Sequence, residues 1–347
     1  MKLKKLIFIS ILTLLTPCFG QIIDSSNVEV LSKHIVQGDT VKKLSDHLWY
    51  VFQDKENNYW YSSNGDGVYR YDGKTIVNFT TKDGLANDTI RQIQEDKFGN
   101  IFITTFGGIN KYDGKKFTTL KAIKSKEWKL EPDDLWFNPL GKRNEHGPYR
   151  YDGTNLYNLE FPKHYLHEEM TQRGINPFFS PYEVYCIYKD RKGAMWFGTS
   201  VFGACRFDGN SIKWMYEYDL TIVPAGGSFG IRSIFEDKEG SYWLCNTWHK
   251  YIFDFEKTLK SDRLQYQKTE GIGNEKIFGG DEYIYYSNII EDNNGNIWLT
   301  TWDQGVYKYD GKNILNYAVK DGLNNVNLIS MYKDNQGNGN TFEKFIP

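Results

Sequence analysis

Residues 90–114 read IRQIQEDKFGNIFITTFGGINKYDG, and residues 289–311 read IIEDNNGNIWLTTWDQGVYKYDG. In each stretch an apolar run is followed by an Asp-x-x-Gly-Asn turn, an aromatic residue in a second short run, a Gly-containing bend and a Tyr-Asp-Gly turn. The first Asp of this pattern recurs at Asp54, Asp96, Asp190, Asp237, Asp292 and Asp334. The chain is therefore an array of internal repeats, and the repeat decides which fold classes remain.

The spacings between these turn Asp residues are 42, 94, 47, 55 and 42. The interval of 94 holds one more, degenerate copy, whose remnants are residues 134–137 and 149–153. Seven units follow, starting near residues 48, 90, 130, 184, 231, 286 and 328. The last unit is short, and its second and third strands are missing from the pattern.

Each unit reads as four short strands. The Asp-x-x-Gly and Asp-Gly steps suit tight hairpins, because Gly adopts positive φ at little cost. Four hairpin-linked strands repeated every 40 to 50 residues or so are typical of a β-propeller. We therefore expect residues 21–347 to form one all-β domain, a seven-bladed β-propeller of four-stranded antiparallel blades with an incomplete last blade. Residues 28–36 resemble a fourth strand, so closure of the ring by both termini is an alternative.

The N-terminus has the pattern of a secretion signal. Three lysines among the first five residues precede the apolar run 6–15, which Pro17 ends, and the small residues Cys18 and Gly20 follow. The apolar run is shorter than the roughly 20 residues that span a bilayer. We expect residues 1–20 to be a signal peptide cleaved after Gly20, with lipidation of Cys18 as the alternative. No later stretch is apolar enough to cross a membrane, which predicts a periplasmic or secreted protein.

Composition excludes some classes of protein. The chain has 347 residues, a formal net charge of -2 and 16% aromatic residues. Such a near-neutral, aromatic-rich chain is neither disordered nor a dedicated nucleic-acid binder. One aromatic residue recurs at a fixed place in strand two, as Trp60, Phe102, Trp136, Trp196, Trp243 and Trp298. Its regular spacing predicts packing between blades and not contact with a ligand.

The repeats resemble those of the two-component regulator propeller family. The residues concerned are Glu95-Asp96-x-x-Gly99-Asn100, Asp190-x-x-Gly193-x-x-Trp196-Phe197-Gly198-Thr199, Glu291-Asp292-x-x-Gly295-Asn296-Ile297-Trp298, Tyr309-Asp310-Gly311-Lys312, Asp83-Gly84-Leu85 and Asp321-Gly322-Leu323. This resemblance implies the periplasmic ligand-binding sensor region of hybrid histidine kinases. Signalling members of the family continue into a transmembrane helix and a kinase, so we expect the sensor half alone.

Loop lengths indicate which face of the propeller binds. Turns between strands one and two and between three and four are tight and lie on one face. On the opposite face lie the connections between strands two and three and from strand four to the next unit. The longest stretches there are residues 121–132, 156–182, 214–230 and 257–286. Because variable loops usually hold binding residues, this second face, called the loop-rich face below, is the expected binding face.

Aromatic residues beside short polar groups on the loop-rich face suit the stacking of a sugar ring or the grip on a peptide. At the bends between strands two and three the candidates are Asp66, Phe106, Phe202, Trp248, His249, Trp302 and Asp303. Arg91 and Arg232 occupy equivalent places at the start of strand one and could hold a carboxylate or sulfate. The alternative is that the aromatics pack between blades and the arginines pair with neighbouring acids.

We expect an extracytoplasmic, sensor-like propeller that binds a glycan, another small polar ligand or a protein partner, without catalysis. The partner protein could be a membrane-bound signalling or transport protein. No cofactor or metal is expected, since His164 and His167 have no third ligand at a meaningful spacing. Two alternatives remain: a propeller lyase or hydrolase using His249 with Asp66 or Asp303, and a structural or adhesion module.

Overall fold

The structure is a computed structural model that describes residues 37–138, 147–172, 180–221, 229–272, 286–323, 326, 328 and 330–333. The predicted signal peptide, Cys18 and the strand expected at residues 28–36 lie outside the described residues. No helix in the described part of the chain has the length and apolar character needed to span a bilayer.

Six β-sheets form the described fold, and we call them blades one to six in chain order. Blade one contains β2 (Leu48–Gln53), β3 (Tyr59–Ser63), β4 (Val68–Tyr71) and β5 (Ile76–Phe79), with β1 (Asp39–Val41) added antiparallel along β5. Blade two contains β6 (Ile90–Glu95), β7 (Ile101–Thr105), β8 (Gly108–Tyr112) and β9 (Phe117–Thr119). Blade three contains β11 (Leu135–Phe137), β12 (Tyr149–Tyr151) and β13 (Leu156–Leu159), and β10 (Ala122–Ser125) pairs parallel with β13.

Blades four to six repeat the same antiparallel order. Blade four contains β14 (Val184–Lys189), β15 (Met195–Thr199), β16 (Ala204–Phe207) and β17 (Ile212–Met215). Blade five contains β18 (Ile234–Glu236), β19 (Tyr242–Leu244), β20 (His249–Phe253) and β21 (Tyr266–Glu270). Blade six contains β22 (Tyr286–Glu291), β23 (Ile297–Thr301), β24 (Val306–Tyr309) and β25 (Ile314–Tyr317). The short helices are η2 (Thr81–Asp83), α1 (His167–Gln172), α2 (Tyr218–Thr221), α3 (Phe255–Leu259) and η3 (Val319–Asp321).

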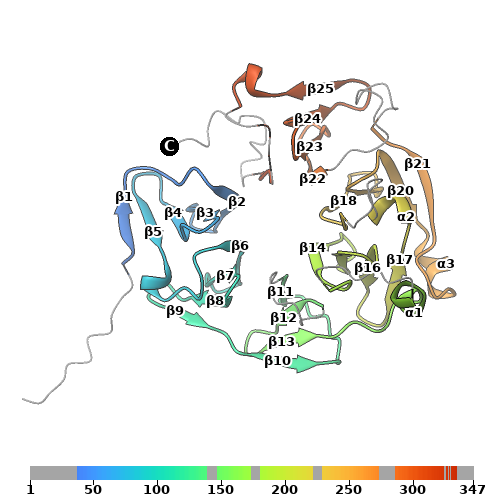
Figure 1. Cartoon of the computed structure of the whole chain (residues 1–347), viewed down its shortest axis with the longest axis horizontal. Coiled ribbons are helices and arrows are strands. Elements are labelled where there is room, and N and C mark those ends of the chain that lie inside the picture. Colours follow the sequence, from blue (N-terminus) through green and yellow to red (C-terminus); the bar gives the residue numbers. More distant parts are fainter. Residues whose placement is uncertain are drawn as a thin grey trace, which may run out of the picture. The chain divides into compact units, whose positions relative to one another are not determined.

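The blades follow one another around a centre, and the first strand of each blade lies nearest to it (Figure 1). Consecutive blades are joined by a repeated contact in which the residue after one turn Asp donates its backbone N–H to the next blade's Glu. These bonds join Lys55 to Glu95 at 3.0 Å, Arg191 to Glu236 at 2.8 Å and Lys238 to Glu291 at 3.1 Å. The repeat therefore encodes contacts between blades as well as the fold of each blade.

The prediction of seven blades is wrong: the structure has six, and no seventh sheet forms among the described residues. The segment expected to begin the seventh unit lies between blades six and one instead. Leu328 donates its backbone N–H to the carbonyl of Thr301 in blade six at 3.0 Å. On the other side the hydroxyl of Ser330 donates to the carbonyl of Trp49 in blade one. The described residues of this last unit therefore bridge blades six and one and add no strand to either sheet.

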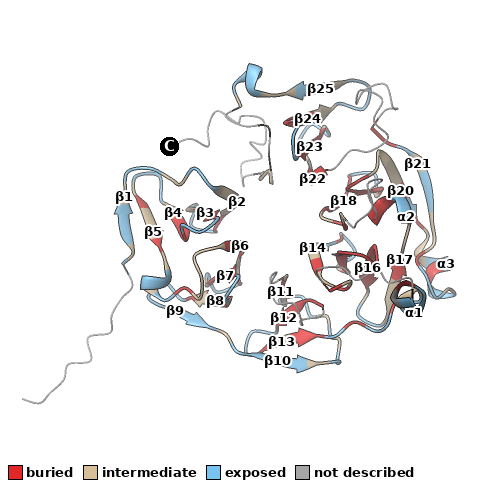
Figure 2. Ribbon diagram, viewed as in Figure 1, coloured by how far each residue is buried: buried red, intermediate tan, exposed pale blue. Residues whose placement is uncertain are grey.

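The turn Asp and the strand-two Trp form one unit. The indole N–H of the Trp donates to the carboxylate of the Asp six residues earlier, at 2.7 Å for Asp54, 3.0 Å for Asp190, 2.8 Å for Asp237 and 2.9 Å for Asp292. The Trp rings are buried and pack against the following blade, as Trp196 does on Tyr242 and Phe253. In Figure 2 the buried residues, drawn in red, lie within the blades, whereas the outer edge strands β9, β10 and β25 are largely exposed. The strand-two aromatics are thus architectural, as their spacing predicted.

Candidate functional site

One position of the repeat directs side chains to the inner end of the loop-rich face. Five residues before the turn Asp stand Trp49, Arg91, Tyr185, Arg232 and Ser287. At this position the pairing of strands one and two skips a residue in β2, β6, β14 and β22. Such β-bulges re-aim a side chain and are common beside functional sites. The repeated bulge therefore gathers residues from different blades at the start of their innermost strands.

Arg232, which comes just before β18, is surrounded by aromatic rings. Its guanidinium carbon lies 4.3 Å from the ring centre of Tyr185, 4.8 Å from that of Phe229 and 5.7 Å from that of Trp302. Trp302 and Phe229 meet edge to face with their centroids 6.2 Å apart. The ring of Trp302 is still 43% exposed. Arg232 therefore lies among three aromatic rings, one of which is an accessible indole.

Arg91 in β6 extends this group of residues. Its guanidinium carbon lies 5.2 Å from the ring centre of Trp49 in β2. Burial lowers the pKa of Arg91, and the like charge of Arg232 lowers it further, against the opposing effects of Tyr50 and Glu183. The two arginines are thus close enough to interact electrostatically. We call Trp49, Arg91, Tyr185, Phe229, Arg232 and Trp302 the inner-end cluster.

Arg91, Arg232 and Trp302 are the predicted site residues that the structure brings together. Phe106 lies on the bend between β7 and β8, where its ring is 37% exposed and its backbone N–H donates to Thr89. Phe202 differs from the expectation, because it is buried in the core of blade four. Its ring stacks on His164 and Tyr182, each with centroids 4.6 Å away. His164 and Tyr182 cover Phe202, so this aromatic residue is not available to a ligand in the structure.

The remaining candidates have separate neighbours. Trp248 stacks on His249 with centroids 5.2 Å apart, and the hydroxyl of Thr247 lies 3.0 Å from Nδ1 of His249. Burial lowers the pKa of His249, with a further lowering by Lys268 and an opposing effect of Glu217. Glu217 accepts hydrogen bonds from Tyr266 at 2.7 Å and Tyr251 at 3.3 Å, and forms an ion pair with Lys268. His249 thus lies beside a network that fixes α2 to β20 and β21.

The two carboxylates that the lyase alternative needs lie in blades one and six. Asp66 accepts a hydrogen bond from the hydroxyl of Ser45 at 2.6 Å and lies 3.4 Å from Nδ1 of His47. Asp303 is exposed next to Trp302, and its charge adds to burial in raising the pKa of Tyr307. Their neighbours are therefore different from those of His249, and the structure gives no acid–base pair made of these three residues.

The histidine pair noted in the sequence is structural as well. His164 is 2% exposed, and its Nδ1 accepts the backbone N–H of Leu166 at 3.1 Å. Nδ1 of His167 lies 3.0 Å from the hydroxyl of Tyr182. Within the described residues, His, Cys, Asp and Glu side chains form no group of three that could hold a metal ion.

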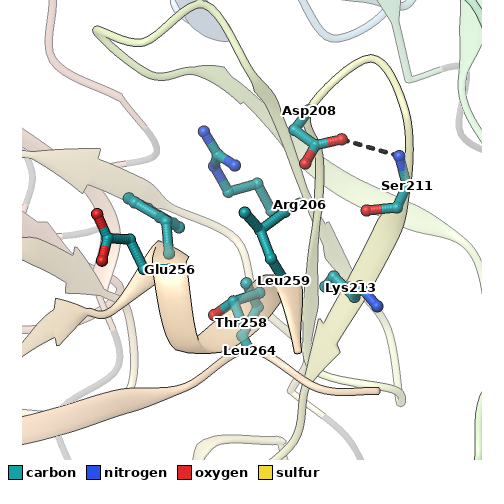
Figure 3. Close-up of a pocket in the computed structure, with 9 residues that line it drawn as sticks. Arg206, Asp208, Ser211, Lys213, Glu256, Thr258, Leu259 and Leu264 are labelled. Atoms are coloured by element: carbon teal, nitrogen blue, oxygen red, sulfur yellow. Dashed lines mark hydrogen bonds between the residues drawn. The ribbon is translucent and has the colours of Figure 1, made fainter. Parts of the chain in front are cut away.

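A second candidate is a cavity of about 220 Å³ beside α3 (Figure 3). In blade five α3 replaces the tight turn between strands three and four, and it leaves a space lined by Leu259, Leu264, Arg206, Lys213 and others. The guanidinium of Arg206 is already paired with Asp190 at 2.7 Å and lies 4.2 Å from the ring centre of Phe255. The guanidinium of Arg206 is therefore already bound within the protein and is not free to hold a ligand in this cavity. The inner-end cluster, by contrast, has an exposed aromatic ring.

Sequence reasoning missed Trp49, Tyr185 and Phe229. A signal for the first two was present, because both stand five residues before a turn Asp, as Arg91 and Arg232 do. The repeat position alone does not show which way the side chain points, because the bulge depends on pairing between strands. Phe229 lies outside the repeat pattern, and no sequence signal indicated it.

Comparison with known proteins supports the family and the fold. Residues 179–201 and 279–303 match the model of the family described as Two component regulator propeller. The chain thus contains repeats of that family, and the resemblance read from its motifs is confirmed. No curated protein matches the chain.

Three solved structures illustrate the fold similarity. The extracellular domain of BT4673 from B. thetaiotaomicron, named as a hybrid two component system, has a TM-score of 0.56 and 18% identity over 87% of this chain and 38% of that chain. PorZ of Porphyromonas gingivalis, named as a bacterial surface component of the type-IX secretion system, has a TM-score of 0.56 and 16% identity, covering 84% and 44%. Virginiamycin B lyase from Staphylococcus aureus has a TM-score of 0.53 and 11% identity, covering 80% and 87%. The chain spans less than half the length of the first two, and these identities show the fold alone.

Proposed function

We propose that this propeller is an extracytoplasmic, sensor-like domain that binds a small polar ligand at the inner-end cluster and performs no reaction. A glycan is the ligand class that the site suits best, and the bound state would be read by a membrane-bound signalling or transport protein. The observation on which this depends is the accessible ring of Trp302, held by Phe229 and backed by Arg232. A fixed aromatic face beside polar groups is the arrangement that stacks on the apolar face of a sugar ring.

The family supports this proposal at a coarser level. Two component regulator propeller repeats are present, and similar folds occur in extracellular domains of proteins named as hybrid two component systems. The lyase alternative has less support, because His249 has neither Asp66 nor Asp303 among its neighbours given above. An adhesion module remains compatible with the same face and is distinguished by the binding experiment.

Substitution of Trp302 tests the proposal. We expect Trp302→Ala to weaken binding of the best oligosaccharide found on a glycan array by about tenfold or more, because a central aromatic contact commonly contributes over 1 kcal/mol. Binding is measured by isothermal titration calorimetry. The matched control is Phe98→Ala, since Phe98 is a 77% exposed aromatic residue in an Asp-x-x-Gly turn on the opposite face. Equal affinity of Trp302→Ala and the unchanged protein would contradict the proposed site.

A further inference from the structure

We propose that the ligand of the inner-end cluster bears an oxyanion, a carboxylate or a sulfate ester, which Arg91 and Arg232 bind together. This inference rests on the proposed function and names the chemical class of its ligand. The ligand would be an acidic sugar whose ring stacks on Trp302 while its anionic group reaches the two guanidinium groups.

Repeat geometry is the first support. Arg91 and Arg232 stand at the same position of their units, each five residues before a turn Asp. In blade two the bulge between Ile90 and Gln92 makes Arg91 the extra residue of its strand. The backbone N–H of Arg232 donates to Sγ of Cys245 at 3.0 Å, which fixes the start of β18 beside β19. Both arginines are therefore held by the sheet framework and are not on mobile loop tips.

The guanidinium of Arg232 has a side-chain hydrogen bond with the hydroxyl of Tyr185, but its Nε is left without one among the described residues. Aromatic rings of Tyr185, Phe229 and Trp302 lie against the guanidinium. Rings on the faces of a guanidinium attract its charge but do not accept its in-plane N–H bonds. Nε of Arg232 is buried and has no hydrogen-bond partner within the part of the chain that the structure describes. An unpaired buried donor costs roughly 1–3 kcal/mol, and an oxyanion in the plane of the fork would satisfy it.

Charge balance points the same way. Burial is the main cause of the lowered pKa of Arg91, and the like charge of Arg232 lowers this pKa further. Glu183 opposes this effect, but a single carboxylate does not neutralise two guanidinium groups. An anion bound between the arginines would relieve the repulsion, and its attraction would be strengthened by the low exposure of the site. Planar guanidinium groups suit carboxylates and sulfates because they bind two oxygens at once.

Three probe ligands distinguish binding of an acidic sugar from binding of any sugar at the inner-end cluster. D-glucuronate tests a carboxylate on a sugar, inorganic sulfate tests the anion alone, and D-glucose tests the neutral ring. Calorimetric titration of each into the purified protein should give an affinity for glucuronate at least tenfold higher than for glucose. We expect sulfate to compete with glucuronate, and the affinity for glucuronate to fall as ionic strength rises.

Variants that keep the charge test the guanidinium fork. Arg232→Lys and Arg91→Lys should each weaken glucuronate binding about tenfold and lower the ratio of glucuronate affinity to glucose affinity, since lysine cannot form the two-oxygen contact. The control is Arg263→Lys, because Arg263 lies 3.8 Å from the ring centre of Tyr165, outside the inner-end cluster. Melting temperatures near that of the unchanged protein show that the variants fold.

Two outcomes would overturn the inference. If glucose binds as tightly as glucuronate and Trp302→Ala weakens both, the ligand is a neutral glycan and the proposed function survives without the anion. If neither glucuronate nor sulfate binds at concentrations up to about 10 mM, the arginine pair is not an oxyanion site. The glycan array with Trp302→Ala then decides separately whether the face binds a sugar.

Discussion

Asp190→Ala is expected to lower the free energy of unfolding by about 3–5 kcal/mol, the largest effect of any single substitution proposed for this chain. One oxygen of the buried Asp190 carboxylate accepts hydrogen bonds from Arg206 at 2.7 Å, Trp196 at 3.0 Å and Tyr242 at 3.3 Å. The other oxygen accepts two backbone N–H groups of its own turn, at 3.0 and 2.9 Å. Alanine would leave a buried guanidinium without its counter-charge and would remove a bond to the next blade. Urea unfolding followed by circular dichroism measures the change.

Two further variants keep this prediction testable if the alanine variant does not fold. Asp190→Asn retains the shape and one acceptor oxygen but loses the charge opposite Arg206, so we expect a smaller loss. Asp310→Ala removes an exposed Asp that accepts the backbone N–H groups of Lys312 and Asn313 at 2.8 and 2.6 Å. We expect this exposed turn to cost no more than about 1 kcal/mol, since its groups can bond to water. A loss of under 1 kcal/mol for Asp190→Ala would show that the buried turn network is not a main source of stability.

Most of the architecture could be predicted from the sequence, because the strand order of each blade depends on the spacing of residues within a single repeat. The Asp-to-Trp spacing of six residues fits one hairpin, and the structure joins Asp190 to Trp196 by a hydrogen bond across that hairpin. The strands β2, β6, β14 and β22 each begin six residues before a turn Asp, so the turn also fixes where the first strand starts. Local spacing is therefore sufficient for strand order and for the buried aromatic position.

The number of blades could not be predicted by counting the same motif. A turn Asp marks the expected end of a first strand, but a blade also needs the strands that pair after it. The segment before Asp334 contacts Trp49 and Thr301 on its two sides, and no sheet follows within the described residues. Whether a repeat forms a sheet or a connection depends on contacts between blades that are distant in sequence, and a motif count contains none of these.

The site was readable only in part, for a related reason. Arg91, Arg232 and Trp302 could be named as candidates because they stand at repeat positions on the loop-rich face. Phe202 stands at a similar bend, yet it is buried, because His164 and Tyr182 from the long connection between blades three and four cover it. Cover by a non-repeating insertion has no periodic signal, so exposure of a bend residue required the structure.

The same insertion gives the chain an acid-sensitive core. Burial lowers the pKa of His164 from 6.5 to about 3, with further lowering by Arg263 and His167. The folded pKa is depressed below the unfolded value, so the unfolded state binds more protons between these two values. Stability is fully present above pH 6.5 and is lost as the pH falls from about 6.5 to 3, by roughly 1.4 kcal/mol per pH unit. At pH 4.5 this amounts to about 3 kcal/mol.

His164→Phe isolates this effect, because phenylalanine keeps an aromatic ring against Phe202 and cannot be protonated. At pH 7.5 we expect a loss of about 1–2 kcal/mol, since the backbone N–H of Leu166 loses its acceptor. The difference in unfolding free energy between pH 7.5 and 4.5, measured by urea titration, should nevertheless be about 2–3 kcal/mol smaller than in the unchanged protein. His47→Phe is the control, because the side chain of His47 is 71% exposed and lies outside the core. An equal pH dependence in His164→Phe and the unchanged protein would mean that His164 is protonated in the folded state without cost, contrary to its burial and to the unpartnered Nε2 among the described residues.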